Sequence, residues 1–414
     1  MERQAITVEK AKEGLLQALK GWKRQTEVID VRQARGRILA TDVLAATDVP
    51  PFNKSPYDGY ALLYSPSQRT YEVVGTVGAG QVWHKPLQAG QALRILTGAA
   101  VPAVCDTVVM QEACQRQDNT IRVVGTFTKG MNIIRQGEEC EKGTVILRQG
   151  IQINAGAMAA LVGMGCQQVE VYKLLQVLVV TTGREIVDID DSLREGTIYN
   201  SNKYMLLSAL RQLENVNLVW HHFTDAPEAY AEELLRLQQD SQQVDVVIST
   251  GGVSVGDYDV IPAWYEACGA ETLYRRLLMR PGAASYGGVR KNKGRQTLFL
   301  GLSGNPTAAY NGLQLIALPL LRYMQGLTRY DWSIVDMPIQ RAIHKKNPFD
   351  RYVQGRVVAG GDGTLSFMPN ELFSAASLLS SIETNGLAKL EKGRDAYIEG
   401  DRVSVLILSD TLLR

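Results

Sequence analysis

Histidine and cysteine are scarce in this sequence, and neither residue type forms a recognisable metal-binding pattern. The 414 residues include four histidines and five cysteines, with no HExxH motif and no CxxC pair. A zinc site built on these residues is therefore disfavoured, as are a disulfide framework and a Ser-His-Asp triad. We expect any catalysis to rest on carboxylates, backbone amides and a metal ion that arrives with the substrate.

An excess of charge of either sign is also missing. The 44 lysines and arginines nearly balance the 43 aspartates and glutamates, and the net charge is +1. Both signs are interspersed, which argues against a basic surface for nucleic acid and against an acidic tail. Long uninterrupted apolar runs are absent too, because those at 153–164 and 313–321 are too short or too interrupted to span a bilayer. The N-terminus shows no signal-peptide core, so we expect a cytoplasmic protein without a membrane partner.

The pattern of apolar residues changes along the chain, from helical spacing to short β-rich runs and back, and this predicts a multidomain α/β plus β protein. Residues 7–22 carry apolar side chains at helical spacing, and 154–162 predict a second apolar helix whose candidate partner is the first. Between them, short β-rich runs at 71–77, 107–111 and 120–126 predict an inserted β domain. The predicted domains are 1–48 with 137–172, then 49–136, 173–328 and 329–414.

The third of these parts alternates apolar strands with amphipathic helices, which predicts a doubly wound parallel sheet. From about residue 332 short alternating strands, such as 355–358 and 402–408, predict a small terminal β barrel or sandwich. The α/β strands are expected at 174–181, 218–223, 244–249 and 297–302, and the helices at 202–213, 228–239, 260–268 and 307–325.

Three of these strands end in small-residue loops, at 181–185, 249–259 and 301–306. Glycine lets the backbone approach a ligand closely, and exposed amides there favour anionic or heteroaromatic groups. Neither Walker A nor GxGxxG is present, which disfavours an ordinary NTPase or dinucleotide enzyme. Because ligands of doubly wound sheets bind at the carboxyl ends of the strands, three such loops predict a binding crevice.

Acidic residues accompany the loops, and several have a purely structural alternative. Asp225 with Glu228, and separately Asp259, could each cap a helix, while Asn305-Pro306 fits an N-cap followed by proline at the first helical position. Glu185 and Asp257 follow glycine loops directly after strands. Carboxylates that converge on such a crevice suit Mg²⁺ bound jointly with a phosphorylated ligand.

Nine short segments occur in an order and spacing that resemble one family, namely MoeA and the gephyrin E domain, the molybdopterin molybdenumtransferases. The resemblance covers essentially the whole chain. It implies an elongated dimerisation domain, an inserted β domain, a MogA-like α/β domain and a C-terminal β barrel-like domain. The segments are 55–61, 95–102, 106–112, 135–139, 182–186, 196–202, 249–259, 280–282 and 304–306.

The resemblance also implies an activity and partners. The family takes adenylylated molybdopterin from a molybdopterin adenylyltransferase, releases AMP, and inserts molybdenum from molybdate, usually with Mg²⁺. It implies a homodimer whose cleft combines the α/β domain of one subunit with the inserted β domain of the other.

Site residues follow by matching position. The resemblance places Asp58 and Thr97 on the molybdate side, and Arg276 and Arg280 on molybdate or phosphate oxygens. The implied Mg²⁺ or phosphate-end residues are Glu185, Asp225 and Asp259. The implied substrate-binding residues are Thr182, Gly183, Ser249, Gly251, Gly252, Ser254, Gly256, Asp257, Gly304, Asn305, Pro306 and Arg351.

Several positions depart from the family pattern. The usual Lys-Pro-Gly-Lys-Pro run begins at Arg280 here and has Ala283 in place of its second lysine. Arg184 stands where an acidic residue is usual, Asn200 where the family has a carboxylate, and Ser303 where it has proline. Arginine keeps the charge of lysine but is a planar fork rather than a point donor. A carrier of the pterin nucleotide, a tungstate insertase and a non-catalytic scaffold therefore stay open beside an active molybdenum insertase.

Overall fold

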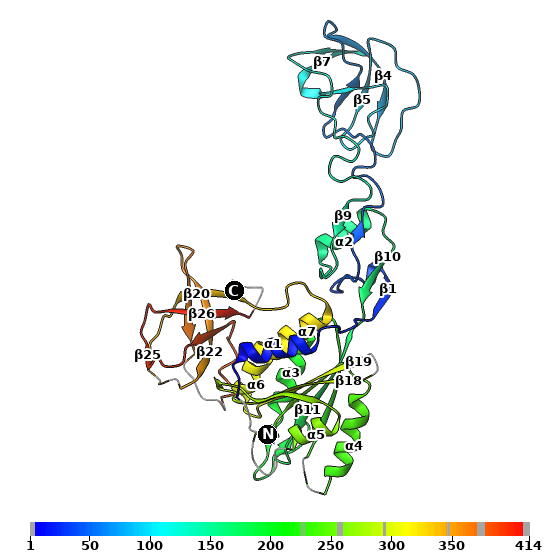
Figure 1. Cartoon of the computed structure of the whole chain (residues 1–414). Coiled ribbons are helices and arrows are strands. Elements are labelled where there is room, and N and C mark those ends of the chain that lie inside the picture. The colour runs from blue at the N-terminus through cyan, green and yellow to red at the C-terminus, as the bar shows by residue number, and fades with distance from the viewer. Residues whose placement is uncertain are drawn as a thin grey trace.

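The computed structural model describes residues 5–224, 226, 228–254, 260–292, 295–344, 346, 348–370 and 377–408. An α/β body and a C-terminal β domain lie side by side, and an arm rises from the body to a separate β lobe (Figure 1). Among the described residues, no helix combines the length and the apolar character needed to cross a membrane.

The body is built on a six-stranded mixed sheet. Its first four strands are parallel, as the sequence predicts, but β18 runs antiparallel to β19, and β16 antiparallel to β18. The prediction of a wholly parallel sheet is therefore wrong at this edge. In sheet order the strands are β14 (Val216–Phe223), β11 (Leu175–Thr182), β15 (Val246–Thr250), β19 (Arg295–Leu302), β18 (Ala284–Asn292) and β16 (Glu271–Arg276).

Helices cover both faces of this sheet, because its central strands are apolar on both sides. Val177 and Val179 of β11 pack in one core, whereas Leu178 and Val180 pack in the other. The first core contains α3 (Ser201–Arg211), α6 (Pro306–Gly312) and α7 (Leu318–Gln325), with a π turn, Leu313–Ala317, between the last two. The second contains α4 (Tyr230–Ser241) and α5 (Ile261–Ala267). The doubly wound arrangement is thus confirmed.

The N-terminal helix α1 (Val8–Ala18) belongs to the core of the body. Its buried Val8, Ala11 and Leu15 pack in the same core as α3 and α7. The expectation that this helix pairs with the helix near 154–162 is wrong. An apolar stripe shows which face of a helix is buried but does not show which surface buries it.

The arm consists of two segments that are far apart in the sequence. Strand β1 (Thr26–Asp30) pairs antiparallel with β10 (Gln168–Tyr172), and β2 (Val43–Leu44) pairs with β9 (Val145–Leu147). Helix α2 (Ala155–Gly163), capped by the Asn154 side chain, packs with the 3₁₀ turn Val31–Gln33.

The lobe at the end of the arm is a six-stranded sheet with an apolar core on each face. The predicted strands at 71–77, 107–111 and 120–126 are confirmed. In sheet order the strands are β6 (Thr107–Met110), β3 (Gly59–Leu62), β5 (Gln91–Ile95), β4 (Thr70–Val77), β8 (Thr120–Val123) and β7 (Cys114–Gln117).

The C-terminal domain borrows a strand from the body. Strand β17 (Met279–Arg280) pairs in parallel with β22 (Asp350–Ala359), so that Arg280 lies opposite Arg351. In the described residues the sheet ends at β17 and β20, and a barrel stays a prediction. The other strands are β20 (Ser333–Pro338), β23 (Leu365–Pro369), β24 (Gly386–Leu390) and β26 (Arg402–Ile407), with a separate pair β21 (Ile343–His344) and β25 (Ala396–Tyr397).

Candidate active site

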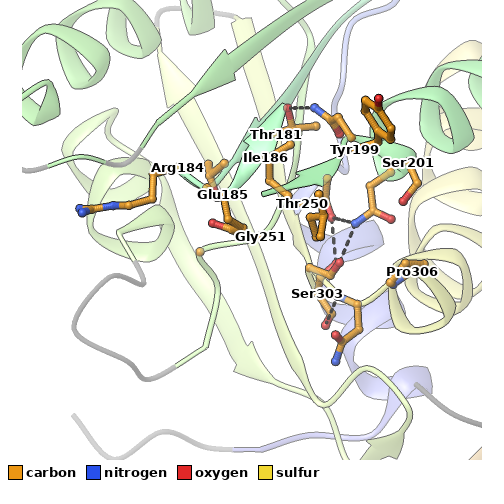
Figure 2. Close-up of a pocket in the computed structure, with 18 of the residues that line it drawn as sticks. Thr181, Arg184, Glu185, Ile186, Tyr199, Ser201, Thr250, Gly251, Ser303 and Pro306 are labelled. Carbon is orange, nitrogen blue, oxygen red and sulfur yellow. Dashed lines mark hydrogen bonds between the residues drawn. The ribbon is translucent and has the colours of Figure 1, made fainter. Parts of the chain in front are cut away.

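The loops that follow β11, β15 and β19 line one pocket of about 1030 Å³ (Figure 2). They are in direct contact: a Cβ atom at Gly251 would lie 2.7 Å from Thr182 Oγ1, and one at Gly304 would lie 3.5 Å from the Gly251 Cα. Gly251 also has a φ of +91°, which side chains rarely tolerate. The glycines therefore allow three strand ends to approach each other closely enough to form one crevice.

Many of the residues predicted for the site line this pocket. Ser249 does not, because its side chain is fully buried within β15. Asp225, Gly256, Asp257 and Asp259 lie outside the described residues. The predicted residues that do line the pocket are Thr182, Gly183, Glu185, Gly251, Gly252, Ser254, Gly304, Asn305 and Pro306.

Glu185 is the one carboxylate among the described residues that line the pocket. Its side chain folds back over Gly183, where an added Cβ would lie 2.8 Å from both carboxylate oxygens. Gly183 has a φ of +132°. The first glycine loop thus leaves room for the Glu185 carboxylate beside the backbone.

Asn202 connects two of the loops. Its Nδ2 donates to Thr250 Oγ1 at 2.9 Å and to the Gly304 carbonyl at 2.7 Å, and Thr250 Oγ1 donates to the Ser303 carbonyl at 2.8 Å (Figure 2). Buried hydrogen bonds of this kind give a polar cluster a single geometry. In the described structure Thr182 Oγ1 is buried without a partner, next to these loops.

One wall of the pocket was not foreseen from the sequence. It comes from 186–202, of which only 186 and 196–202 belong to segments that resemble the family pattern. The useful signal was Asn200, an N-cap residue whose side chain accepts from the Lys203 amide at the start of α3. The lining residues from this segment are Ile186, Leu193, Thr197, Ile198, Tyr199, Asn200, Ser201 and Asn202.

Asp58 and Thr97 interact with each other but lie in the distant lobe. Asp58 Oδ1 accepts hydrogen bonds from the Thr97 amide and from Thr97 Oγ1, both at 2.8 Å. These hydrogen bonds lower the pKa of Asp58, and the one from the Thr97 backbone amide contributes most. Within one chain the arm holds this pair far from the pocket (Figure 1).

The three arginines predicted for the site are not among the described residues that line the pocket. They are Arg276, Arg280 and Arg351. Arg276 is exposed at the end of β16. Arg280 and Arg351 lie opposite each other in neighbouring strands, and burial together with Arg280 lowers the pKa of Arg351. Ala284, four residues after Arg280, does line the pocket.

The donors available for a metal ion are few. Within the described ranges no group of three or more His, Cys, Asp or Glu side chains is arranged to hold one. Mg²⁺, however, commonly takes only one or two carboxylates and completes its shell with water and substrate phosphates. Glu185, in a cleft lined by backbone amides, fits that mode of binding and does not fit an all-protein metal cage.

Three family models match the chain in succession. Residues 6–165 match the MoeA N-terminal region (domain I and II), 178–323 a probable molybdopterin binding domain, and 336–408 the MoeA C-terminal region (domain IV).

Similar proteins cover nearly the whole chain. Proteins named molybdopterin molybdenumtransferase from Staphylococcus epidermidis and Staphylococcus aureus are each 31% identical over 386 residues, which are 92% of this chain and 90% of theirs. The crystal structure of a molybdopterin biosynthesis MoeA protein from Pyrococcus horikosii covers 98% of this chain and 100% of its own, with a TM-score of 0.80 and 24% identity. That structure supports the fold.

Proposed function

The chain belongs to the molybdopterin molybdenumtransferase family, enzymes of molybdenum cofactor biosynthesis, and on this premise we propose that its pocket binds adenylylated molybdopterin and releases AMP while molybdenum from molybdate enters the dithiolene. The observation that carries the proposal is the meeting of three strand-end loops around Glu185. Such loops suit a ligand that joins a heteroaromatic ring to phosphates.

The phosphate end of the substrate has two sources of recognition in the pocket. The glycine loops offer backbone N–H groups, and the N-terminus of α3, through Ser201 and Asn202, faces the same space. Helix N-termini favour phosphate because their first N–H groups lack partners within the helix. Asn202 keeps the second and third loops in register, so the donors are arranged before the substrate arrives.

Glu185 is the described residue that would hold Mg²⁺, and Asp225 and Asp259 are its proposed partners outside the described part. When bound, Mg²⁺ would neutralise charge that develops on the phosphate oxygens. Glu185 itself is oriented by the loop: its backbone carbonyl accepts from the Ile198 amide at 2.8 Å, and its side chain is confined over Gly183.

Arg280 and Arg351, with Arg276 nearby in sequence, are our candidates for the molybdate oxygens. Their side chains are planar forks that match tetrahedral and planar oxyanions through paired hydrogen bonds. Arg280 and Arg351 lie opposite each other in neighbouring strands, which brings them close enough to contact one anion together. This chain has one basic side chain fewer than the family pattern, because Ala283 stands where the pattern has its second lysine. A carrier that binds the nucleotide without turnover is the alternative that the loss of this lysine favours.

Asp58 and Thr97 lead us to propose a homodimer. The arm holds them far from the pocket of their own chain, so they act in the reaction only if the lobe of a second subunit reaches the pocket. We further propose the four predicted domain ranges, except that α1 packs in the core of the body and is assigned to it. A cytoplasmic location and an adenylylating enzyme that supplies the substrate complete the proposal.

The test is a single incubation of purified protein with adenylylated molybdopterin, Mg²⁺ and either molybdate or tungstate, followed by measurement of AMP and of metallated cofactor. We expect molybdate-dependent AMP release that falls roughly 10²-fold in Glu185→Gln. Glu232→Gln, an exposed carboxylate on α4, is the matched control. Tight binding of the nucleotide without AMP release would identify a carrier instead.

A further inference from the structure

A short segment, which we call the strap (residues 186–199), forms one wall of the pocket. It begins with β12 (Ile186–Val187) and ends with β13 (Ile198–Tyr199), and the two strands pair in parallel. Glu185 precedes the strap directly, and Asn200 follows it. Because five strap residues line the pocket, its position sets both the shape of that wall and the place of Glu185.

The strap is held closed at its own ends by backbone bonds. The Ile198 amide donates to the Glu185 carbonyl at 2.8 Å, and the Asn200 amide donates to the Val187 carbonyl at 2.9 Å. These bonds keep β12 and β13 together and join the strap to Glu185 and to Asn200, the N-cap residue of α3, but they act only at its two ends. A side-chain contact with α3 holds the strap at a further point.

Asp188 makes that contact. Its carboxylate forms an ion pair with Lys203 Nζ and accepts a hydrogen bond from Tyr204 Oη at 2.7 Å; both partners lie on α3. Asp188 Oδ1 also accepts the Ile189 amide at 2.8 Å. The side chain is therefore fixed from the helix and from its own backbone. A hydrogen bond between two charged groups is about twice as strong as a neutral one.

Lys203 is confined on its other side by an aromatic ring. Its Nζ lies 3.6 Å from the ring centroid of Trp220 on β14 and 4.8 Å from that of Tyr204. The Lys203 side chain is only 12% exposed. An ammonium group over an indole face gains a cation–π interaction, which strengthens as water is excluded. One charge thus connects the strap, helix α3 and the sheet.

We infer that Lys203 is a positioning residue that, through Asp188, fixes the strap and with it Glu185 against the substrate pocket. The inference rests on the proposed function for the role of Glu185. The path is short, since Asp188 is three residues beyond Glu185 and the intervening β12 is paired along its whole length. The pKa shifts agree with the geometry. The hydrogen bond from Lys203 is the main cause that lowers the pKa of Asp188 to about 2. Burial alone would lower the pKa of Lys203, but the same hydrogen bond and the charge of Asp188 raise it.

The test combines Lys203→Met, which keeps most of the side-chain volume without the charge, with Lys203→Arg, which keeps the charge. Lys12→Met removes a lysine from another ion pair, with Asp331, and is the matched control. Hydrogen exchange of the whole protein without ligand reports on 186–199. AMP release and nucleotide affinity report on Glu185.

We expect faster exchange confined to the strap in Lys203→Met, with kcat for AMP release lowered about ten-fold and nucleotide affinity changed much less, since a small misplacement of a reacting group slows turnover strongly. Lys203→Arg is expected to restore both readouts, and Lys12→Met to change neither. Unchanged exchange of the strap in Lys203→Met would overturn the inference, as would faster exchange with unchanged AMP release. If the wild type itself releases no AMP, the proposed function fails, and hydrogen exchange alone decides whether Lys203 holds the strap.

Discussion

Asn200 donates from its side-chain Nδ2 to Thr181 Oγ1 at 2.8 Å, and the amide orientation is fixed because Asn200 Oδ1 accepts the Lys203 amide at 3.1 Å. Thr181 Oγ1 also accepts from Trp220 Nε1 at 3.4 Å. Both lone pairs of the Thr181 hydroxyl then accept hydrogen bonds. The hydroxyl therefore donates its own hydrogen bond to the remaining neighbour, His222 Nδ1, at 3.1 Å.

The hydrogen bonds around Thr181 predict the tautomer of His222. With Nδ1 an acceptor, His222 is neutral and protonated on Nε2. In Asn200→Asp the carboxylate still caps α3 but cannot donate, so the Thr181 hydroxyl turns toward it and Nδ1 becomes the donor. We expect nitrogen-15 NMR of the imidazole to show an exchange of the two ring-nitrogen shifts between wild type and Asn200→Asp. The same tautomer in both proteins would contradict this network.

Burial of His222 predicts a pH dependence of stability. Burial lowers the pKa of His222 below 6.5, against the opposing influence of Thr181, Glu233, Glu185 and Asp188. Below pH 6.5 the unfolded chain therefore binds a proton that the folded chain resists, and stability falls as the pH falls. We expect the urea midpoint to drop less between pH 7 and pH 5.5 in His222→Asn than in the wild type.

His221 supplies the background in that comparison. Its pKa is also lowered, by burial first and then by Arg236. Because it is present in both proteins, its contribution cancels in the difference between them. Equal pH slopes for the wild type and His222→Asn would show that His222 does not carry the effect.

The close approach at Gly251 predicts a large effect of a single methyl group. Gly251→Ala places Cβ 2.7 Å from Thr182 Oγ1 at a positive φ. Gly80→Ala is the control, because Gly80 has a φ of +80° with nothing within 4 Å of the added Cβ. Both variants bear backbone strain of about 1–2 kcal/mol, but only Gly251→Ala is expected to lose nucleotide binding. Thermal melts and a binding titration separate the two effects.

The proposed shared site predicts complementation between subunits. Asp58→Ala and Glu185→Gln are each expected to inactivate a homodimer, one through the lobe and the other through the pocket. A mixed dimer keeps one intact site, so an equal mixture with free subunit exchange should regain about a quarter of wild-type AMP release. No recovery, with exchange demonstrated by mass spectrometry, would rule out a site shared between subunits.

The alternation of strands and helices from β11 to α7 could be predicted because each element carries its own signal: buried β-branched runs for strands and spaced leucines for helices. The edge strands β16 and β18 could not. Their sequences mix polar, apolar and glycine residues without a clear alternation. The side chains of Tyr274 and Tyr286 occupy the space beside Gly287 and Gly288, where side chains would otherwise lie. Their pairing depends on β19, which no local pattern reports.

The candidate site, like the fold, could be predicted only in part. Glycines after strands located the loops around Gly183, Gly251 and Gly304 because their conformational freedom is a local property. The strap could not be predicted, since β12 and β13 are two-residue strands whose position depends on Asp188 and Lys203, a contact between segments. The family resemblance implies that Ser249 contacts the ligand, but the pleat of β15 turns this side chain into the body.

The bridge between Val49 and Cys140 has a consequence for the lobe at the end of the arm. The Val49 amide donates to the Cys140 carbonyl at 2.7 Å, so the chain enters the lobe and leaves it at neighbouring positions. The arm therefore constrains only the two ends of the lobe, at Val49 and Cys140. It does not constrain the length or the fold of the chain between them. A different lobe can therefore be inserted between Val49 and Cys140 without altering the α/β body, but Asp58 and Thr97 would be lost with the original one.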